Sequence, residues 1–290
     1  THPHTTRSRL MLEVASALVN RRDWPLLQAR VSLREQGSDD WPLTLFGSDS
    51  PATISEVAAG KVQFAMINPG MILKLAALGS APFRAPIPLR IIAVLPALDQ
   101  MVFAVKQSTG LRSIADIRDR KFPLKLSLRG QPDHSLQVII DHVCAAAGFT
   151  LDDIVSWGGV VKFDAGMPYG QNRIGAVYRG EIDAIFDEGA SAWGNMALDL
   201  GMTFLSLPEA LLQRLEAVGL RRGLIEKKSF PKLSADVPTL ETVDATAIRL
   251  NDKGDIETLG SVTIGGIDVA IVALQRLGRS RQDAARSSKY

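Results

Sequence analysis

The chain has 290 residues, and its 33 lysines and arginines nearly balance its 31 aspartates and glutamates, for a formal net charge of +2. Hydrophobic residues make up 46% and charged residues 22% of it, which excludes disordered, collagen-like and disulfide-scaffold proteins. The balanced charge also argues against nucleic acid as a partner, because phosphate binding needs a concentrated basic surface.

Metal and membrane signals are weak throughout the sequence. Cys144 is the single cysteine, so no internal disulfide can form, and the histidines lack the spacing of a zinc site. We therefore expect no metal and no cofactor. No apolar run has the length of a membrane-spanning helix, and the sequence opens at Thr1 without an apolar signal core. Either the protein is cytosolic or a signal peptide has been removed, and we expect removal.

The spacing of apolar and turn-forming residues predicts alternating strands and helices. In chain order we expect a helix over 9–20, a strand over 42–46, a helix over 53–60, a strand over 63–67, a helix through 78, strands over 89–94 and 101–106, a short helix from 113, a strand over 124–128 and a helix over 135–147. Since the chain is about twice the length of a common domain, this order favours two lobes or one large α/β unit.

Particular residues mark several of the expected boundaries between strands and helices. Pro96 separates the two expected strands on either side of it. The strand over 124–128 alternates apolar and polar residues, as a half-buried strand does. The helix that follows has Asp133 as its expected cap and Gly148 as its end. This is the best-defined helix of the chain.

An internal repeat is the most informative feature of the sequence. The segment 54–67 is matched by 174–187, each a helix that ends in a glycine and leads into a buried strand. The two copies lie in different halves of the chain. They predict two similarly built α/β lobes, each with a polar loop where its strand ends.

Six segments in order carry a resemblance to a known family. They are Phe46-Gly-Ser-Asp-Ser50, Ala59-Gly-Lys-Val-Gln-Phe-Ala-Met-Ile-Asn68, Leu89-Arg-Ile-Ile-Ala-Val94, Gly110-Leu-Arg-Ser-Ile-Ala-Asp116, Pro132-Asp-His-Ser135 and Arg179-Gly-Glu-Ile-Asp-Ala-Ile-Phe-Asp-Glu188. Together they resemble the type 2 periplasmic solute-binding proteins, and within them the TAXI-type receptors of TRAP transporters and the related nitrate, sulfonate and thiamine-precursor receptors of ABC transporters. Each segment is a weak motif by itself, and their order is the stronger signal.

The resemblance implies an α/β fold of two lobes, each a mixed sheet flanked by helices, hinged by crossing strands. We expect the first lobe over 1–106, with 241–290 returning to it, the second lobe over 107–240, and the ligand cleft between them. The chain would then be a monomeric, non-catalytic, periplasmic or otherwise extracytoplasmic receptor. Its expected partners are a small polar or anionic solute (an organic acid, an amino acid or a ring compound) and the permease subunits of a TRAP- or ABC-type transporter.

The sequence also departs from the family pattern at both ends. Residues 1–9 offer neither the first strand nor the glycine-rich loop with which such receptors usually begin. After Leu240, the polar segment 251–255 predicts a hairpin turn, and 267–277 predicts a helix that does not align with the family. We therefore expect part of the usual pocket to be missing.

If two lobes close on a solute, the contacts should come from loops at the ends of strands. The residues that we expect to contact it are Ser48, Ser50 and Asn68 in the first lobe, and Arg129, Gln131, His134, Ser135, Tyr169, Asp187, Glu188 and Trp193 in the second. Arg129 is the best candidate for binding an anion, since a guanidinium can hold a carboxylate through two hydrogen bonds.

Each of these candidates also has a structural explanation. The two serines and Asn68 suit turns and caps equally well, and His134 could cap the helix that follows it. The two acids could interact with the start of the next helix instead of a solute. The two aromatic side chains could pack in the core instead of forming a flat wall for the solute.

Two other functions share the fold that the resemblance implies. One is an enzyme similar to pyrimidine-precursor synthases or porphobilinogen deaminase, which would need a reactive Cys144, although Cys144 lies on the apolar face of its expected helix. The other is the ligand-sensing effector domain of a regulator. That domain would normally be joined to a helix-turn-helix, which the helix over 9–20 alone does not supply.

Overall fold

The computed structural model describes residues 30–33, 43–46, 50–61, 64–131 and 134–249. Its strands are β1 (Arg30–Leu33), β2 (Leu43–Phe46), β3 (Phe64–Ile67), β4 (Leu89–Gln100), β5 (Val102–Lys106), β6 (Lys125–Arg129), β7 (Val160–Asp164), β8 (Ala184–Asp187), β9 (Met202–Phe204), β10 (Arg221–Ile225) and β11 (Val237–Arg249). Its helices are α2 (Ser50–Ala58), α3 (Met71–Leu78), α4 (Ala115–Asp119), α5 (Ser135–Ala147), α6 (Leu151–Ser156), α7 (Ile174–Tyr178), α8 (Ala190–Asp199) and α9 (Glu209–Ala217), with a 3-10 turn over Gln107–Thr109.

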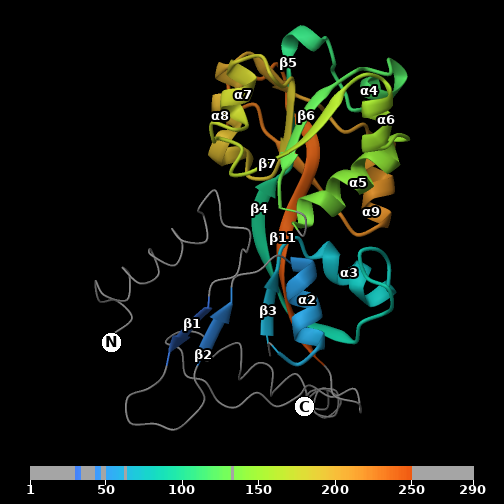
Figure 1. The fold of residues 1–290 in the computed structure, drawn as a ribbon, viewed down its shortest axis with the longest axis vertical. Coiled ribbons are helices and arrows are strands. Elements are labelled where there is room, and N and C mark those ends of the chain that lie inside the picture. The colour runs from blue at the N-terminus through green and yellow to red at the C-terminus, as the bar shows by residue number, and fades with distance from the viewer. Residues whose placement is uncertain (1–29, 34–42, 47–49, 62–63, 132–133, 250–290) are drawn as a thin grey trace, which may run out of the picture.

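Two long strands connect two α/β lobes. Figure 1 shows β4 and β11 running from the lobe that contains α2 and α3 to the lobe that contains α4 to α9. The two strands pair antiparallel over most of their length. The α/β fold of two lobes hinged by crossing strands, which the resemblance implies, is therefore confirmed.

The sheet of the second lobe places three strand ends at one edge. Its order is β7-β6-β8-β5-β9, in which β6 is parallel to β7 and β8, while β5 is antiparallel to β8 and β9. Parallel neighbours need crossover connections, and the helices α5 to α7 supply them. The carboxyl ends of β6, β7 and β8 therefore lie at the same edge of the sheet.

Both faces of this sheet are covered. Leu126 and Leu128 of β6 pack with the apolar face of α5, and Ile185 of β8 packs with α7 and α8 on the opposite face. The polar side of β6 lies on that second face, where Ser127 has no exposed surface and Arg129 is 7% exposed. The alternation in this strand predicts one exposed face. That prediction is wrong, because the polar face is also buried.

The sheet that contains β3, β4, β10 and β11 is antiparallel. β11 pairs with β10 along its first half, with β3 along its second half, and with β4 on the other side. The helix α2 packs against β3 and β11. The expected break at Pro96 is wrong, since β4 continues to Gln100. In the described part of the chain β4 pairs with β11 alone, and an edge strand accommodates a residue that has no N–H to donate.

The boundary between the lobes differs from the expected one. We expected the strand over 101–106 in the first lobe, but β5 pairs with β8 and β9 of the second sheet. β11 is likewise one continuous strand that crosses the expected boundary after residue 240. The chain therefore passes between the lobes near Gln100–Met101 and again within β11.

The two copies of the repeat form the same local structure. In each copy a helix, α2 or α7, ends before a glycine with positive φ, 71° at Gly60 and 78° at Gly180, and leads into a strand, β3 or β8. The last strand residues of the copies, Ile67 and Asp187, are both fully buried. The repeat is confirmed, with a hydrophobic residue at this position in one lobe and an acid in the other. The features expected over 9–20, 251–255 and 267–277 lie outside the described residues.

Hydrogen bonds hold the two strands together where they cross. The backbone N–H of Met101 donates to the carbonyl of Leu240 at 2.8 Å, and the hydroxyl of Thr239 donates to the carbonyl of Met101 at 2.6 Å. The lobes also meet at their helices, where Nζ of Lys74 on α3 donates to the carbonyl of Ala217 at the end of α9, at 2.9 Å. The relative position of the lobes therefore depends on contacts from both strands and helices.

The substitution Thr239→Val tests the crossing. Thr239 is only 4% exposed, so losing its hydrogen bond should lower the free energy of unfolding by about 1–2 kcal/mol. Urea unfolding measures this change. Thr203→Val on β9, away from the crossing, is the control and should change stability by less. Equal effects of the two substitutions would show that the Thr239 bond contributes nothing specific.

Candidate ligand-binding site

Three charged residues end the three parallel strands of the second lobe. β6 ends at Arg129, β7 at Asp164 and β8 at Asp187. Arg129 pairs with Asp164 in the register of β6 and β7, and the pairing of Ser127 with Ile185 puts Arg129 level with Asp187. The three side chains therefore form a row across the sheet edge, on the face that α7 and α8 cover.

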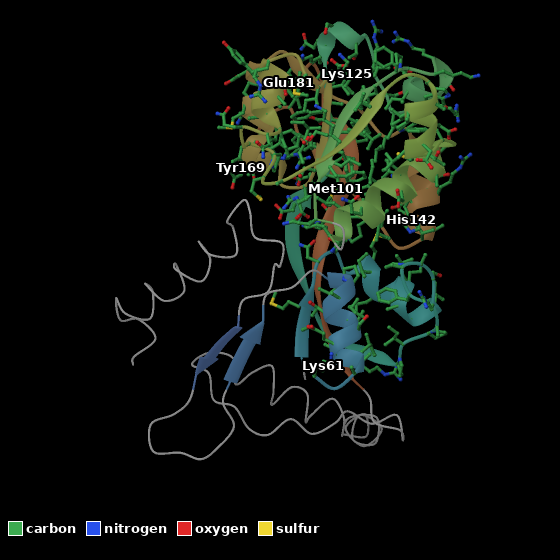
Figure 2. All side chains as sticks on the ribbon, viewed as in Figure 1. Lys61, Met101, Lys125, His142, Tyr169 and Glu181 are labelled. Atoms are coloured by element: carbon green, nitrogen blue, oxygen red, sulfur yellow. The ribbon has the colours of Figure 1, made fainter. Side chains whose placement is uncertain are left out.

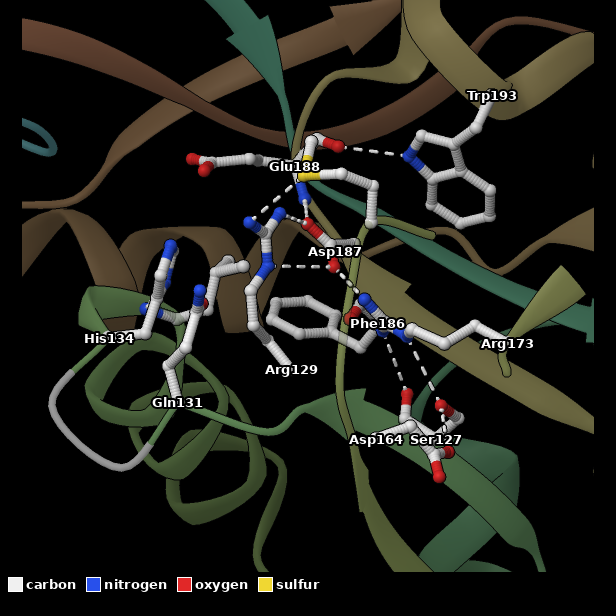
Figure 3. Close-up of polar contacts among 12 residues, drawn as sticks. Ser127, Arg129, Gln131, His134, Asp164, Arg173, Phe186, Asp187, Glu188 and Trp193 are labelled. Atoms are coloured by element: carbon white, nitrogen blue, oxygen red, sulfur yellow. Dashed lines mark hydrogen bonds and ion pairs between the residues drawn. The ribbon is translucent and has the colours of Figure 1, made fainter. Parts of the chain in front are cut away.

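Asp187 holds the guanidinium of Arg129 through two hydrogen bonds. Nη2 of Arg129 lies 2.5 Å from one carboxylate oxygen, and Nε lies 3.3 Å from the other. Asp187 has no exposed surface, whereas Arg129 keeps 7%. Figure 3 shows this pair at the centre of a polar cluster. The bidentate geometry fixes the plane of the guanidinium, so Arg129 is held in one orientation.

A second arginine holds the same carboxylate from the other side. Nη1 of Arg173 forms an ion pair with Asp187, and Nη2 donates to the backbone carbonyls of Ser127 at 3.2 Å and Phe186 at 3.0 Å. Nε of Arg173 donates to the hydroxyl of Ser127 at 3.2 Å, and that hydroxyl donates to Asp164 at 2.7 Å. Arg173 is itself fully buried. It therefore ties β6 and β8 together and fixes Asp187.

The amino terminus of α5 lies beside Arg129. The side-chain amide of Gln137, in the first turn of α5, donates to the carbonyl of Arg129. Nδ1 of His134 accepts from the backbone N–H of Leu136 at 3.2 Å, so His134 caps the helix. We expected Asp133 as the cap, but Asp133 lies outside the described residues and His134 fills this role. The positive end of the helix dipole therefore adds to the charge of Arg129.

Gly130 brings the ends of β6 and β7 into close contact. Its N–H donates to the carbonyl of Asp164 at 2.9 Å. A Cβ atom at this position would lie 2.9 Å from the carbonyl carbon of Asp164, closer than packed atoms can approach. Gly130 therefore permits the close approach of the ends of β6 and β7.

Other candidates in the second lobe meet the cluster in different ways. Oε1 of Gln131 is buried and has no hydrogen-bond partner among the described residues. The backbone N–H of Glu188 donates to Asp187 at 2.9 Å, and Nε1 of Trp193 donates to the carbonyl of Glu188 at 2.9 Å. Ser135 is 5% exposed at the start of α5. The structure thus gathers these residues around the ends of β6 and β8.

Trp193 has a structural role, and the other candidates that the structure describes lie away from the cluster. Trp193 is 1% exposed and packs in the core beside α7 and α8, so the core explanation fits it better than a wall for the solute. Tyr169 is 46% exposed on the loop after β7, and Figure 2 shows it at the periphery of the second lobe. In the first lobe, Asn68 follows β3, Ser50 begins α2 earlier than the expected start at Thr53, and Ser48 lies outside the described residues.

Sequence reasoning missed Ser127, Asp164 and Arg173. The alternation over 124–128 could have indicated Ser127, because Ser127 shares the polar side of its strand with Arg129. Asp164 could have been found as the last residue of a strand parallel to β6. Arg173 stands directly before the second repeat copy, at the position where Thr53 precedes the first copy. The second copy therefore begins with an arginine that joins the charged cluster, where the first copy has a threonine.

Within the described part of the chain, no three histidine, cysteine, aspartate or glutamate side chains are grouped so that they could hold a metal ion. The same residues include no helix that is long and apolar enough to cross a membrane.

The sequence matches no protein-family model and no curated protein. Among similar solved structures, the glycine betaine/L-proline-binding protein ProX from Borrelia burgdorferi is 10% identical with a TM-score of 0.43, over 83% of this chain and 77% of that chain. PhnD1 from Prochlorococcus marinus, solved with methylphosphonate, is 12% identical with a TM-score of 0.40, over 79% and 68%. The alkanesulfonate-binding protein SsuA from Xanthomonas axonopodis, bound to MOPS, is 17% identical with a TM-score of 0.35. That alignment covers 56% of this chain, which spans about half, 49%, of SsuA.

The substitution Asp187→Asn tests the role of the shared carboxylate. It leaves Arg129 and Arg173 buried without their common counter-charge, so the free energy of unfolding should fall by about 3–5 kcal/mol. Guanidinium chloride unfolding measures the loss. Asp199→Asn is the matched control, because Asp199 pairs with Lys232 at 2.5 Å while both side chains are 62% exposed. The fall in the free energy of unfolding for Asp199→Asn should stay below about 1 kcal/mol. A loss for Asp187→Asn as small as that of the control would contradict the account.

His134 should make stability depend on pH. Burial lowers its pKa from 6.5 to about 4, and the nearby charge of Arg129 acts in the same direction. The unfolded chain therefore binds this proton more readily than the folded protein does. The resulting stability is complete above pH 6.5 and is lost as the pH falls toward 4.

His134→Asn removes the titrating group and keeps a good helix cap. Between pH 7.5 and pH 5, the wild type should lose about 2 kcal/mol more unfolding free energy than the variant. Urea unfolding at both pH values measures the difference, and the other histidines cancel because both proteins contain them. Parallel pH profiles would show that His134 is not protected from protonation.

Proposed function

We propose that the chain is an extracytoplasmic solute-binding receptor in which Arg129 binds the negative group of a small organic solute. The observation that carries this proposal is the held guanidinium of Arg129 at the carboxyl edge of three parallel strands. A guanidinium that is fixed in advance loses little entropy when it binds an anion through two hydrogen bonds. The adjacent start of α5 favours the same charge.

The buried carboxylate of Asp187 acts in this proposal as a positioning group. Both of its oxygens already accept hydrogen bonds from arginines, so it orients Arg129 instead of meeting the solute. Gln131 and Ser135 lie close to the same strand end and supply polar contacts for the rest of the solute. The predicted contacts of Ser50 and Asn68 would come from the first lobe when the lobes close.

The two strands that join the lobes allow the lobes to close on a solute. β4 and β11 connect them, and small changes in two strands can move one lobe as a rigid body. A solute held at Arg129 would gain contacts from the first lobe and would be enclosed away from water. Delivery to the permease of an ABC- or TRAP-type transporter, an extracytoplasmic location and a monomeric state belong to the same proposal. The TAXI-type assignment is its most specific part.

An enzyme on the same fold is less well supported. It would use Cys144, but this residue is 1% exposed, and burial raises the pKa of its thiol, with the charge of Asp141 adding to the effect. The thiol therefore stays protonated and is a poor nucleophile. Its place on the inner face of α5 favours packing.

Titration calorimetry with carboxylates, alkylsulfonates and alkylphosphonates tests the proposal. The wild type should bind at least one of these anions, and Arg129→Gln should weaken that binding by at least about 30-fold, or 2 kcal/mol. Arg129→Lys keeps the charge but loses the two-pronged geometry, so its affinity should be intermediate. Thermal unfolding should show the same order, because a bound solute stabilises the folded state.

Arg112→Gln is the control, since Arg112 is exposed on the same lobe and should leave affinity unchanged. Each variant is titrated only after circular dichroism confirms that it is folded. The proposal fails if no anion of the panel binds, or if folded Arg129→Gln binds as tightly as the wild type.

A further inference from the structure

Met167 contacts the guanidinium of Arg129 from the loop that follows β7. Nη1 of Arg129 donates a hydrogen bond to the sulfur of Met167 at 3.4 Å. A thioether is a weak acceptor, so a stronger acceptor can displace it. The sulfur therefore lies at a nitrogen on the side of the guanidinium that Asp187 does not hold.

The sulfur of Met167 belongs to a solvent-accessible side chain. Met167 is 37% exposed, although the arginine that it contacts is only 7% exposed. Met71, Met101 and Met202 are buried, and the other exposed methionines among the described residues, Met66 and Met196, lie on β3 and α8. In this part of the chain, Met167 thus combines exposure to an oxidant with contact to Arg129.

We infer that Met167 is an oxidative modification site that controls solute binding at Arg129. The inference rests on the proposed function of Arg129. Hydrogen peroxide transfers one oxygen atom to the sulfur: the S–O bond forms, the O–O bond breaks and water leaves, so that the sulfur loses two electrons and the peroxide gains them. The product is a sulfoxide, whose oxygen accepts hydrogen bonds strongly.

Oxidation would place that oxygen next to a donor that already faces the sulfur. A charge-assisted hydrogen bond from Arg129 to the sulfoxide is stronger than the present bond to the thioether. The sulfoxide therefore competes with an anionic solute for the same guanidinium. Reduction of the sulfoxide restores the weak acceptor, so the control is reversible.

The experiment measures anion affinity before and after peroxide treatment of the full chain. Calorimetry uses the tightest-binding anion of the panel, and peptide mass spectrometry measures the extent of oxidation at Met167. Oxidised wild type should bind about tenfold more weakly, and treatment with methionine sulfoxide reductase should restore the affinity. Circular dichroism confirms that the treated protein stays folded.

Met167→Leu is the control, because it keeps a similar volume without the sulfur. Its affinity should not change with peroxide, although its other exposed methionines are still oxidised. Unchanged affinity of the wild type with Met167 fully oxidised, or an equal loss in Met167→Leu, would overturn the inference. An absence of anion binding before any treatment would instead overturn the proposed function.

Discussion

The buried carboxylate of Asp187 is the constraint on which the candidate site depends. It has no exposed surface and accepts hydrogen bonds from two arginines. Burying one carboxylate with two guanidinium groups is favourable only when nearly every donor finds an acceptor. Arg173 meets this condition with two backbone carbonyls and the hydroxyl of Ser127. The cluster therefore fixes side-chain geometry more than it adds stability, and Arg129 is the group that it orients.

The fold explains why such a cluster can exist in the second lobe. Three parallel strands end together, and their registers put Arg129, Asp164 and Asp187 in one row. The helices α7 and α8 cover this face of the sheet, and the burial of Arg129 and Asp187 strengthens the interaction between them. The first lobe repeats the helix and strand but has Ile67 where the second has Asp187. In the proposed receptor, the second lobe holds the charged group and the first lobe supplies the closing surface.

Local sequence patterns predicted the elements well and their surroundings less well. The alternation over 124–128 located β6, but it could not show that α7 and α8 would bury the polar side with Ser127 and Arg129. The repeat predicted both helix-to-strand units, because a glycine ends each helix. Arg173 was not found, because its partners come from strands that are distant in sequence. The break expected at Pro96 was wrong, because β4 pairs with a strand on one side alone in the described residues and so tolerates a residue without an N–H. The contact between Asp187 and a solute stays a prediction, and the two arginine partners of Asp187 could not be foreseen from spacing alone.

A crystal structure of the chain with its tightest-binding anion would test the central claim most directly. The account predicts that the anion accepts hydrogen bonds from the guanidinium of Arg129, while Asp187 keeps its contacts with both arginines. It also predicts that residues of the first lobe approach the same anion. An anion bound away from Arg129, or an Arg129 side chain that has left Asp187 to reach it, would contradict the account.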